Sequence, residues 1–107
     1  MRIAIAGMAA DENGVVGRHA ARAECYLVYD ETGTFCEVIQ NPFKDYDRAV
    51  GVRVADYLAE KAIDVLVAGN FGVGFVRALD VKGVRHVESE GRVKDVARDL
   101  AARFGAA

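Results

Sequence analysis

The sequence of 107 residues has no tryptophan, one proline and only two cysteines. Those cysteines are eleven positions apart with no second pair, which fits neither a disulfide framework nor a four-ligand zinc site, so we expect reduced thiols. Serine and threonine occur only at Thr32, Thr34 and Ser89, without a histidine and an aspartate beside them, and a hydrolytic triad has no support. No apolar run approaches the roughly 20 residues that span a bilayer. We therefore expect a cytoplasmic protein that does not contact membranes.

An excess of positive charge is also missing. The chain has 14 basic and 16 acidic residues and a formal net charge of -2. Such a chain has no overall positive field to attract phosphate backbones, so nonspecific nucleic-acid binding is not expected. The 52% hydrophobic content is typical of a folded protein. The length suits one compact domain over residues 1–107.

Short apolar segments and helical patterns follow one another in an order that predicts an α/β fold. Strands are expected at residues 2–6, 25–30, 35–39, 64–68 and 84–87, and helices from about 45 to 62, 74 to 81 and 93 to 104. The second and third strands flank a glycine-containing turn and predict a β-hairpin, and the later strand-helix-strand crossovers demand parallel neighbours. Asp45 or Asp47 is expected to cap the first helix. Gly51 inside that helix predicts close packing or the approach of a ligand.

Several local motifs lie at characteristic places in this order. A long loop, residues 8–23, ends in His19-Ala20-Ala21-Arg22-Ala23, and an aromatic strand follows. Asn41-Pro42 follows the third strand, and Gly-x-x-Gly at 69–72 follows the fourth strand. Together these motifs resemble the dinitrogenase iron-molybdenum cofactor biosynthesis family over nearly the whole chain. The resemblance implies a ribonuclease H-like, five-stranded mixed sheet in the order 3-2-1-4-5, with strand 2 antiparallel and three helices.

A ribonuclease H-like fold raises the question of nuclease activity. That chemistry needs several carboxylates to hold magnesium, one of them projecting from the first strand. Residues 3–6 are Ile-Ala-Ile-Ala, so the first strand offers no such ligand. The fold alone does not imply nuclease activity, and the missing carboxylate argues against it. We therefore expect a protein that is not an enzyme.

Few residues of this chain suit an anionic metal-sulfur cofactor, which needs thiolate or imidazole donors and positive charge. His19 lies where the family histidine falls, between Arg18 and Arg22, so one metal ligand and two charges can face one anion. The same pattern also fits a solvated histidine among surface arginines. Cys25 is either a second metal ligand or a small core residue, and whether Cys36 faces it depends on the hairpin register.

The bend after the fourth strand is the other candidate for binding an anion. Its residues Gly69, Asn70, Phe71 and Gly72 lead into a helix, so backbone N–H groups and the helix dipole can hold negative charge. The alternative is a tight turn that needs glycine geometry. No Gly-Lys-Ser/Thr follows, so it is not a phosphate-binding P-loop. Parallel strands open their carboxyl ends toward this bend and the histidine loop, and we expect both to line one cleft.

These observations lead to one principal hypothesis and two competitors. The first is a binding or carrier protein for an iron-molybdenum or other molybdenum/iron-sulfide cluster or its precursor, exchanged with a donor or acceptor protein. The second is a metal-free regulatory or interaction module of the same fold, which the Ala20-Ala21 pair favours because family members have Phe-Gly there. The third, an enzyme acting on a small anionic substrate, is opposed by the absence of a base near the glycine bend. The oligomeric state is left open.

Overall fold

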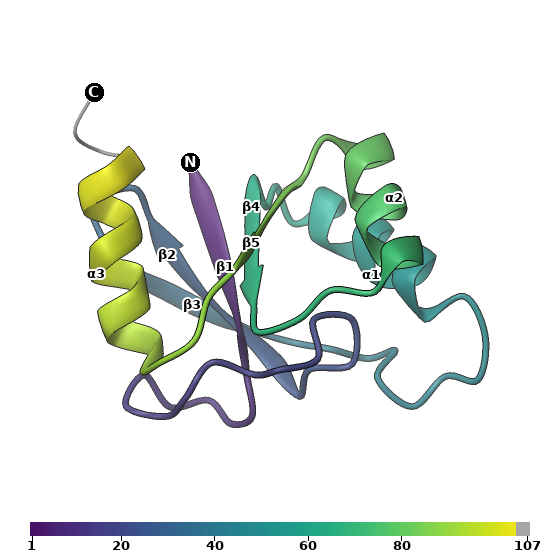
Figure 1. The fold of residues 1–107 in the computed structure, drawn as a ribbon, viewed down its shortest axis with the longest axis horizontal. Coiled ribbons are helices and arrows are strands. Elements are labelled where there is room, and N and C mark those ends of the chain that lie inside the picture. The colour runs from purple at the N-terminus through teal and green to yellow at the C-terminus, as the bar shows by residue number, and fades with distance from the viewer. Residues whose placement is uncertain (105–107) are drawn as a thin grey trace.

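The computed structural model describes residues 1–104, and within them the predicted strands and helices are all present (Figure 1). The strands are β1 (Arg2–Gly7), β2 (Cys25–Asp30), β3 (Phe35–Gln40), β4 (Val65–Ala68) and β5 (Arg85–Glu88). The helices are α1 (Val50–Glu60), α2 (Val73–Lys82) and α3 (Val93–Phe104). The sheet order is β3-β2-β1-β4-β5; β2 is antiparallel to both its neighbours, and β1, β4 and β5 are parallel. The expected fold class, strand order and β-hairpin are confirmed.

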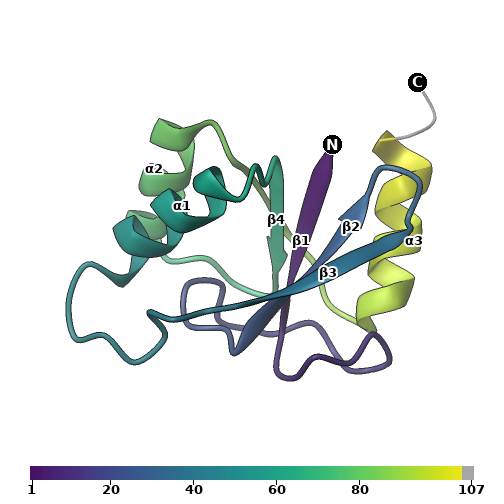
Figure 2. The ribbon, with the colours of Figure 1, turned by 180° about the vertical axis from the view of Figure 1, so that it is seen from behind.

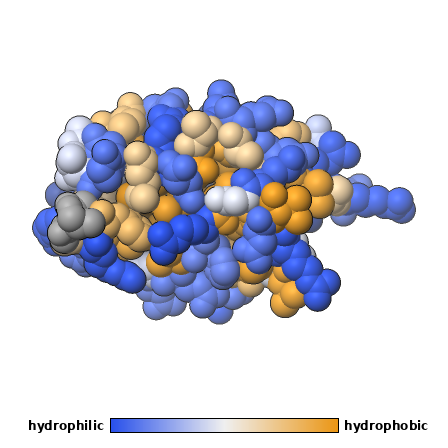
Figure 3. All heavy atoms as spheres, turned by 90° about the horizontal axis from the view of Figure 1, so that it is seen from above, coloured by the Kyte–Doolittle hydropathy of each residue, from blue (hydrophilic) through white to orange (hydrophobic). Residues whose placement is uncertain are grey.

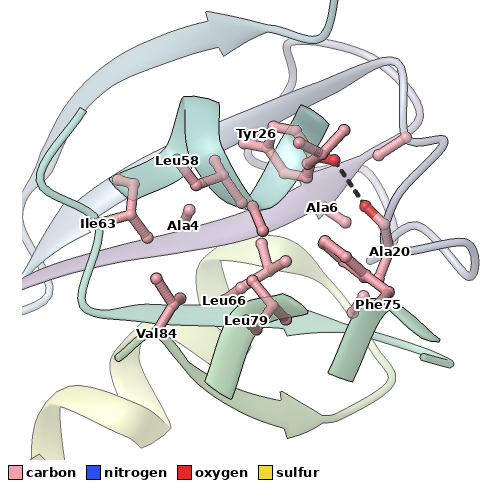
Figure 4. Packing of buried hydrophobic residues seen from close by; sticks show 14 of the residues in the cluster. Ala4, Ala6, Ala20, Tyr26, Leu58, Ile63, Leu66, Phe75, Leu79 and Val84 are labelled. Carbon is pink, nitrogen blue, oxygen red and sulfur yellow. Dashed lines mark hydrogen bonds between the residues drawn. The ribbon is translucent and has the colours of Figure 1, made fainter. Parts of the chain in front are cut away.

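The central strands are apolar on both faces because helices cover both sides of the sheet. Alternate side chains such as Tyr26 and Leu66 pack with α1 and α2 on one face. Their strand neighbours Leu27 and Val67 pack with α3 on the other face. Figure 2 shows these three layers from behind, and Figure 4 shows the core under α1 and α2. The fold is therefore a sheet between two helical layers.

The surface mixes hydrophilic and hydrophobic residues. Figure 3 views the end of the molecule opposite the long loop, where mostly hydrophilic residues surround a smaller set of hydrophobic ones. No helix within residues 1–104 has both the length and the hydrophobicity needed to cross a bilayer.

The start of α1 differs from its prediction. Ala49 is the residue before the first turn and has φ 58, in the left-handed region, so the helix cannot continue backwards through it. Asp45 and Asp47 lie upstream in the loop, and within residues 1–104 no side chain caps this helix. The expected aspartate cap is therefore wrong. The predicted close packing at Gly51 is confirmed, because a Cβ there would lie 3.3 Å from the Cα of Phe75 in α2.

Candidate functional site

The histidine loop and the glycine bend lie side by side at the carboxyl ends of β1 and β4. A parallel bridge pairs His19 with Asn70. The Asn70 amide donates a hydrogen bond to the Arg18 carbonyl at 2.7 Å, and the Ala20 amide donates to the Asn70 carbonyl at 3.2 Å. The two segments are thus joined by backbone bonds, as the positions of the strand ends predict.

Gly69 allows this close approach. Its amide donates to the Gly17 carbonyl at 2.9 Å. A Cβ at Gly69 would lie 3.1 Å from the Cα of Arg18, which is tighter than an ordinary van der Waals contact. Glycine therefore suits this position because another backbone passes next to it.

Three hollows adjoin one another along this end of the molecule, and together we call them the groove. The first, about 260 Å³, is lined by His19, Ala20, Ala21, Arg22, Asn70 and Gly72. The second, about 400 Å³, is lined by Ala21, Arg22, Ala49, Val50, Gly51, Val52, Gly72, Gly74 and Phe75. The third, about 240 Å³, is lined by Gly7, Met8, Gly17, His19, Arg22, Ala23 and Glu24. Arg22 lines all three, so it lies at the centre of the groove.

The electrostatics of the groove favour an anion. His19 and Arg22 line the groove and are exposed, and the neighbouring Arg18 is exposed but is not among the residues that line it. The carboxylate of Glu24 is paired with the Lys44 ammonium at 2.8 Å, which offsets its negative charge. The first turns of α1 and α2 both line the second hollow, and within residues 1–104 neither has an acidic residue or a side-chain cap. Their first N–H groups and dipoles are therefore available to negative charge.

A comparison with known protein families identifies the chain. The sequence pattern described as "Dinitrogenase iron-molybdenum cofactor" matches residues 1–103. The chain belongs to this family. A search of the curated proteins gave no match.

Solved structures agree with the family and the fold. The chain is 25% identical to the orange protein (ORP) of Desulfovibrio gigas, solved in its apo form, with a TM-score of 0.83 over 98% of this chain and 87% of that one. It is 31% identical to a NifB-like protein of Thermotoga from the DUF35 family, with a TM-score of 0.76 over 95% of this chain and 87% of that one. The protein PH0822, 20% identical, has a TM-score of 0.78 over 99% and 92% of the two chains and supports the fold alone.

In this member of the iron-molybdenum cofactor family, Arg22 also shapes the groove. One of its guanidinium nitrogens, Nη1, donates to the carbonyl oxygens of Lys44 at 2.7 Å and Tyr46 at 3.0 Å. Arg22 therefore ties the histidine loop to the segment before α1. Its expected role in neutralising a bound anion stays a prediction.

Phe71 differs from its neighbours in the glycine bend. Its side chain is 9% exposed and belongs to the core beneath α1 and α2. The ring stacks on Phe75 with centroids 6.0 Å apart and meets the His86 ring edge-on at 5.1 Å. Phe71 is therefore part of the core and is not among the residues that line the groove, whereas Asn70 and Gly72 line it.

The structure places the two cysteines in different surroundings. Cys25 is 2% exposed and packs in the core under α3, outside the residues that line the groove. Burial, and secondly the charge of Glu24, raise the pKa of the Cys25 thiol. Cys36 is exposed, and both thiols are free. Cys25 therefore lies outside the groove, and its role as a metal ligand stays a prediction.

Native thiol labelling checks this placement. With iodoacetamide near pH 8 we expect Cys36 to be alkylated at least tenfold faster than Cys25, because the reactive thiolate of Cys25 is disfavoured and inaccessible. Both cysteines lie in one tryptic peptide, residues 23–44, so fragment ions from tandem mass spectrometry measure the two rates, and labelling in urea supplies the unfolded reference. Equal native rates would contradict the buried position of Cys25.

The sequence points to the first turn of α1 only through Gly51, for which it predicts close packing or the approach of a ligand. Glycine is a costly residue inside a helix. In the structure Gly51 brings the first turns of α1 and α2 together. The two helix starts can then face one ligand.

Proposed function

We propose that this chain binds a preassembled, anionic molybdenum/iron-sulfide cluster or its precursor in the groove and carries it as cargo, without catalysing a reaction. Membership of a family associated with the dinitrogenase cofactor supports the chemical class of the cargo. The observation that carries the proposal is the pairing of the exposed His19 with the Asn70 bend, between two arginines. This arrangement offers one metal ligand, positive charge and the N–H groups of two helix starts. The Gly69 and Asn70 amides, which the sequence predicts as donors to the anion, are instead bonded to the Gly17 and Arg18 carbonyls.

The ligand set fits an intact cluster better than a bare metal ion. Within residues 1–104 no group of three or more His, Cys, Asp or Glu side chains is arranged to hold a metal ion. A bare ion such as zinc needs three or four protein ligands. A cluster already carries sulfide ligands, so a single imidazole from His19 suffices while Arg18 and Arg22 balance its charge.

Openness of the site also suits a carrier. His19, Arg18 and Arg22 are exposed, and within residues 1–104 no helix or loop covers the groove as a lid. A ligand bound by one metal bond and by charge is released more easily than one held by several metal bonds. Exchange with a donor or acceptor protein is therefore part of the proposal.

Titration with tetrathiomolybdate, a metal-sulfide dianion, tests the proposal. We expect the purified chain to bind one equivalent, seen as a change in charge-transfer absorption. His19→Ala should weaken binding about tenfold, because about 1.4 kcal/mol of interaction with the dianion is lost. The second histidine supplies the matched control: His86 contacts Phe71 and is not among the residues that line the groove, so His86→Ala should bind like the wild type.

Three results would reject this account: no binding by the wild type, equal loss in both histidine variants, or stoichiometric uptake of Zn²⁺ or Fe²⁺ alone. The last would indicate a bare-ion site. The alternative of a metal-free module is favoured by the small Ala20 and Ala21 side chains, of which Ala20 is 2% exposed. Elemental analysis of the natively expressed protein separates the two, because a carrier retains molybdenum or iron and a metal-free module does not.

A further inference from the structure

Residues 20–23, which connect His19 to β2 and include Arg22, belong to no helix or strand. Their carbonyl groups are instead bonded by two buried side chains. The Tyr26 hydroxyl donates to the Ala20 carbonyl at 2.6 Å, drawn as the dashed line in Figure 4. The Asn41 side-chain amide donates to the carbonyls of Ala21 and Ala23 at 2.9 and 3.0 Å. This segment is thus held from the core side.

Asn41 is 4% exposed and is the one buried polar or charged residue within residues 1–104. Its Oδ1 accepts a hydrogen bond from the Phe43 amide at 3.1 Å, and its Nδ2 lies 3.3 Å from the Tyr26 hydroxyl. The donors of the side chain are therefore used by the segment 20–23, and its acceptor by the chain that leaves β3. Burying an amide is favourable only when these bonds are made.

We propose that Asn41 and Tyr26 are positioning residues for the groove: they set where His19 and Arg22 stand without touching the ligand. Their bonds fix the carbonyls on both sides of Arg22 and the one that follows His19. Arg22 in turn bonds the carbonyls of Lys44 and Tyr46, which follow Asn41 in the chain. The groove is therefore built around one buried polar network. As a statement about ligand binding, this inference rests on the proposed function.

Two tyrosines of the same strand make a matched test. Tyr26 is 0% exposed and Tyr29 2% exposed, and each hydroxyl donates one hydrogen bond, the latter to Glu12 Oε1 at 2.7 Å. They lie on opposite faces of the sheet. Phenylalanine at either position removes one hydroxyl and keeps the ring. Both variants should be less stable, because Tyr26→Phe loses the bond to Ala20 and the 3.3 Å contact with Asn41, and Tyr29→Phe loses a part-buried bond to a carboxylate.

Only Tyr26→Phe should change the groove. We expect its dissociation constant for tetrathiomolybdate to rise about fivefold, as for one lost hydrogen bond. The backbone amides of residues 19–23 should exchange hydrogen at least fivefold faster, measured by NMR without ligand. Tyr29→Phe should lower the midpoint of thermal unfolding but leave the dissociation constant and the exchange rates of residues 19–23 unchanged. Asn41→Ala removes two of the three bonds to the carbonyls of residues 20–23. It should raise the dissociation constant and the exchange rate more than Tyr26→Phe does.

Each outcome decides the question. Equal affinity and equal exchange at residues 19–23 in the two tyrosine variants would overturn the positioning role and leave an ordinary core hydrogen bond. If the wild type does not bind tetrathiomolybdate, the proposed function fails, and the exchange measurement still tests whether Tyr26 holds the segment. If Asn41→Ala does not fold, the tyrosine pair gives the answer alone.

Discussion

Gly69→Val is expected to weaken tetrathiomolybdate binding by about 100-fold, equivalent to about 3 kcal/mol. A Cβ at this position would lie 3.1 Å from the Arg18 Cα, and the branched methyl groups of valine add to the crowding. The bend and the histidine loop must then separate. That movement breaks or lengthens the bonds from the Gly69 and Asn70 amides to the Gly17 and Arg18 carbonyls, now 2.9 and 2.7 Å. His19 and the bend would no longer face the same ligand.

Gly69 supports the groove from outside its lining, and adding a side chain to Gly74, a glycine that lines the groove, gives the comparison. Gly74 lies in the first turn of α2, and a Cβ there meets no atom within 4 Å. Gly74→Ala should raise the free energy of unfolding by up to about 1 kcal/mol through helix propensity. For Gly69→Val we expect a loss of about 2 kcal/mol, mostly from two weakened hydrogen bonds. Circular dichroism shows whether the variant is folded before its affinity is measured. Near-normal binding by folded Gly69→Val would refute the shared groove.

Backbone geometry brings the segments of the groove together, and this explains why the sequence predicts where the groove lies. Segments that follow parallel strands must meet at one edge of the sheet, so His19 and the bend at 69–72 are placed together by strand order alone. The apolar runs of β1 and β4 fix that order because each needs cover on both faces. The fold and the location of the site therefore follow from pattern and topology.

Details that depend on the pairing register of strands or on contacts between distant residues cannot be predicted from sequence pattern and strand order. Cys25 pairs with Gly7 and so faces α3; a shift of one residue would turn its thiol to the other face. Ala49 adopts a left-handed conformation that local propensity does not favour, in a segment whose carbonyls bond Arg22 from the histidine loop. Asn41 bonds carbonyls 18 and 20 positions earlier in the chain. Such partners become visible only when the strands are assembled.

The largest effect on stability is expected at Leu66 in the middle of β4. Its side chain is 0% exposed and packs with Leu58 and Leu79 in the core under α1 and α2 (Figure 4). Leu66→Ala removes buried methyl and methylene groups and leaves a cavity, which typically costs about 3–5 kcal/mol. Since a domain of this size has a total stability of roughly 5–15 kcal/mol, the variant should be only marginally stable.

Urea unfolding followed by circular dichroism measures this loss. The control is Val81→Ala on α2, where the valine is 83% exposed, and its change should stay within about 0.5 kcal/mol. By binding the folded state, tetrathiomolybdate should raise the unfolding midpoint of Leu66→Ala as it raises that of the wild type. If Leu66→Ala lost no more stability than Val81→Ala, the core described for this face of the sheet would be wrong. Stabilisation by the ligand in the wild type but none in folded Leu66→Ala would instead show that β4 sets the geometry of the groove.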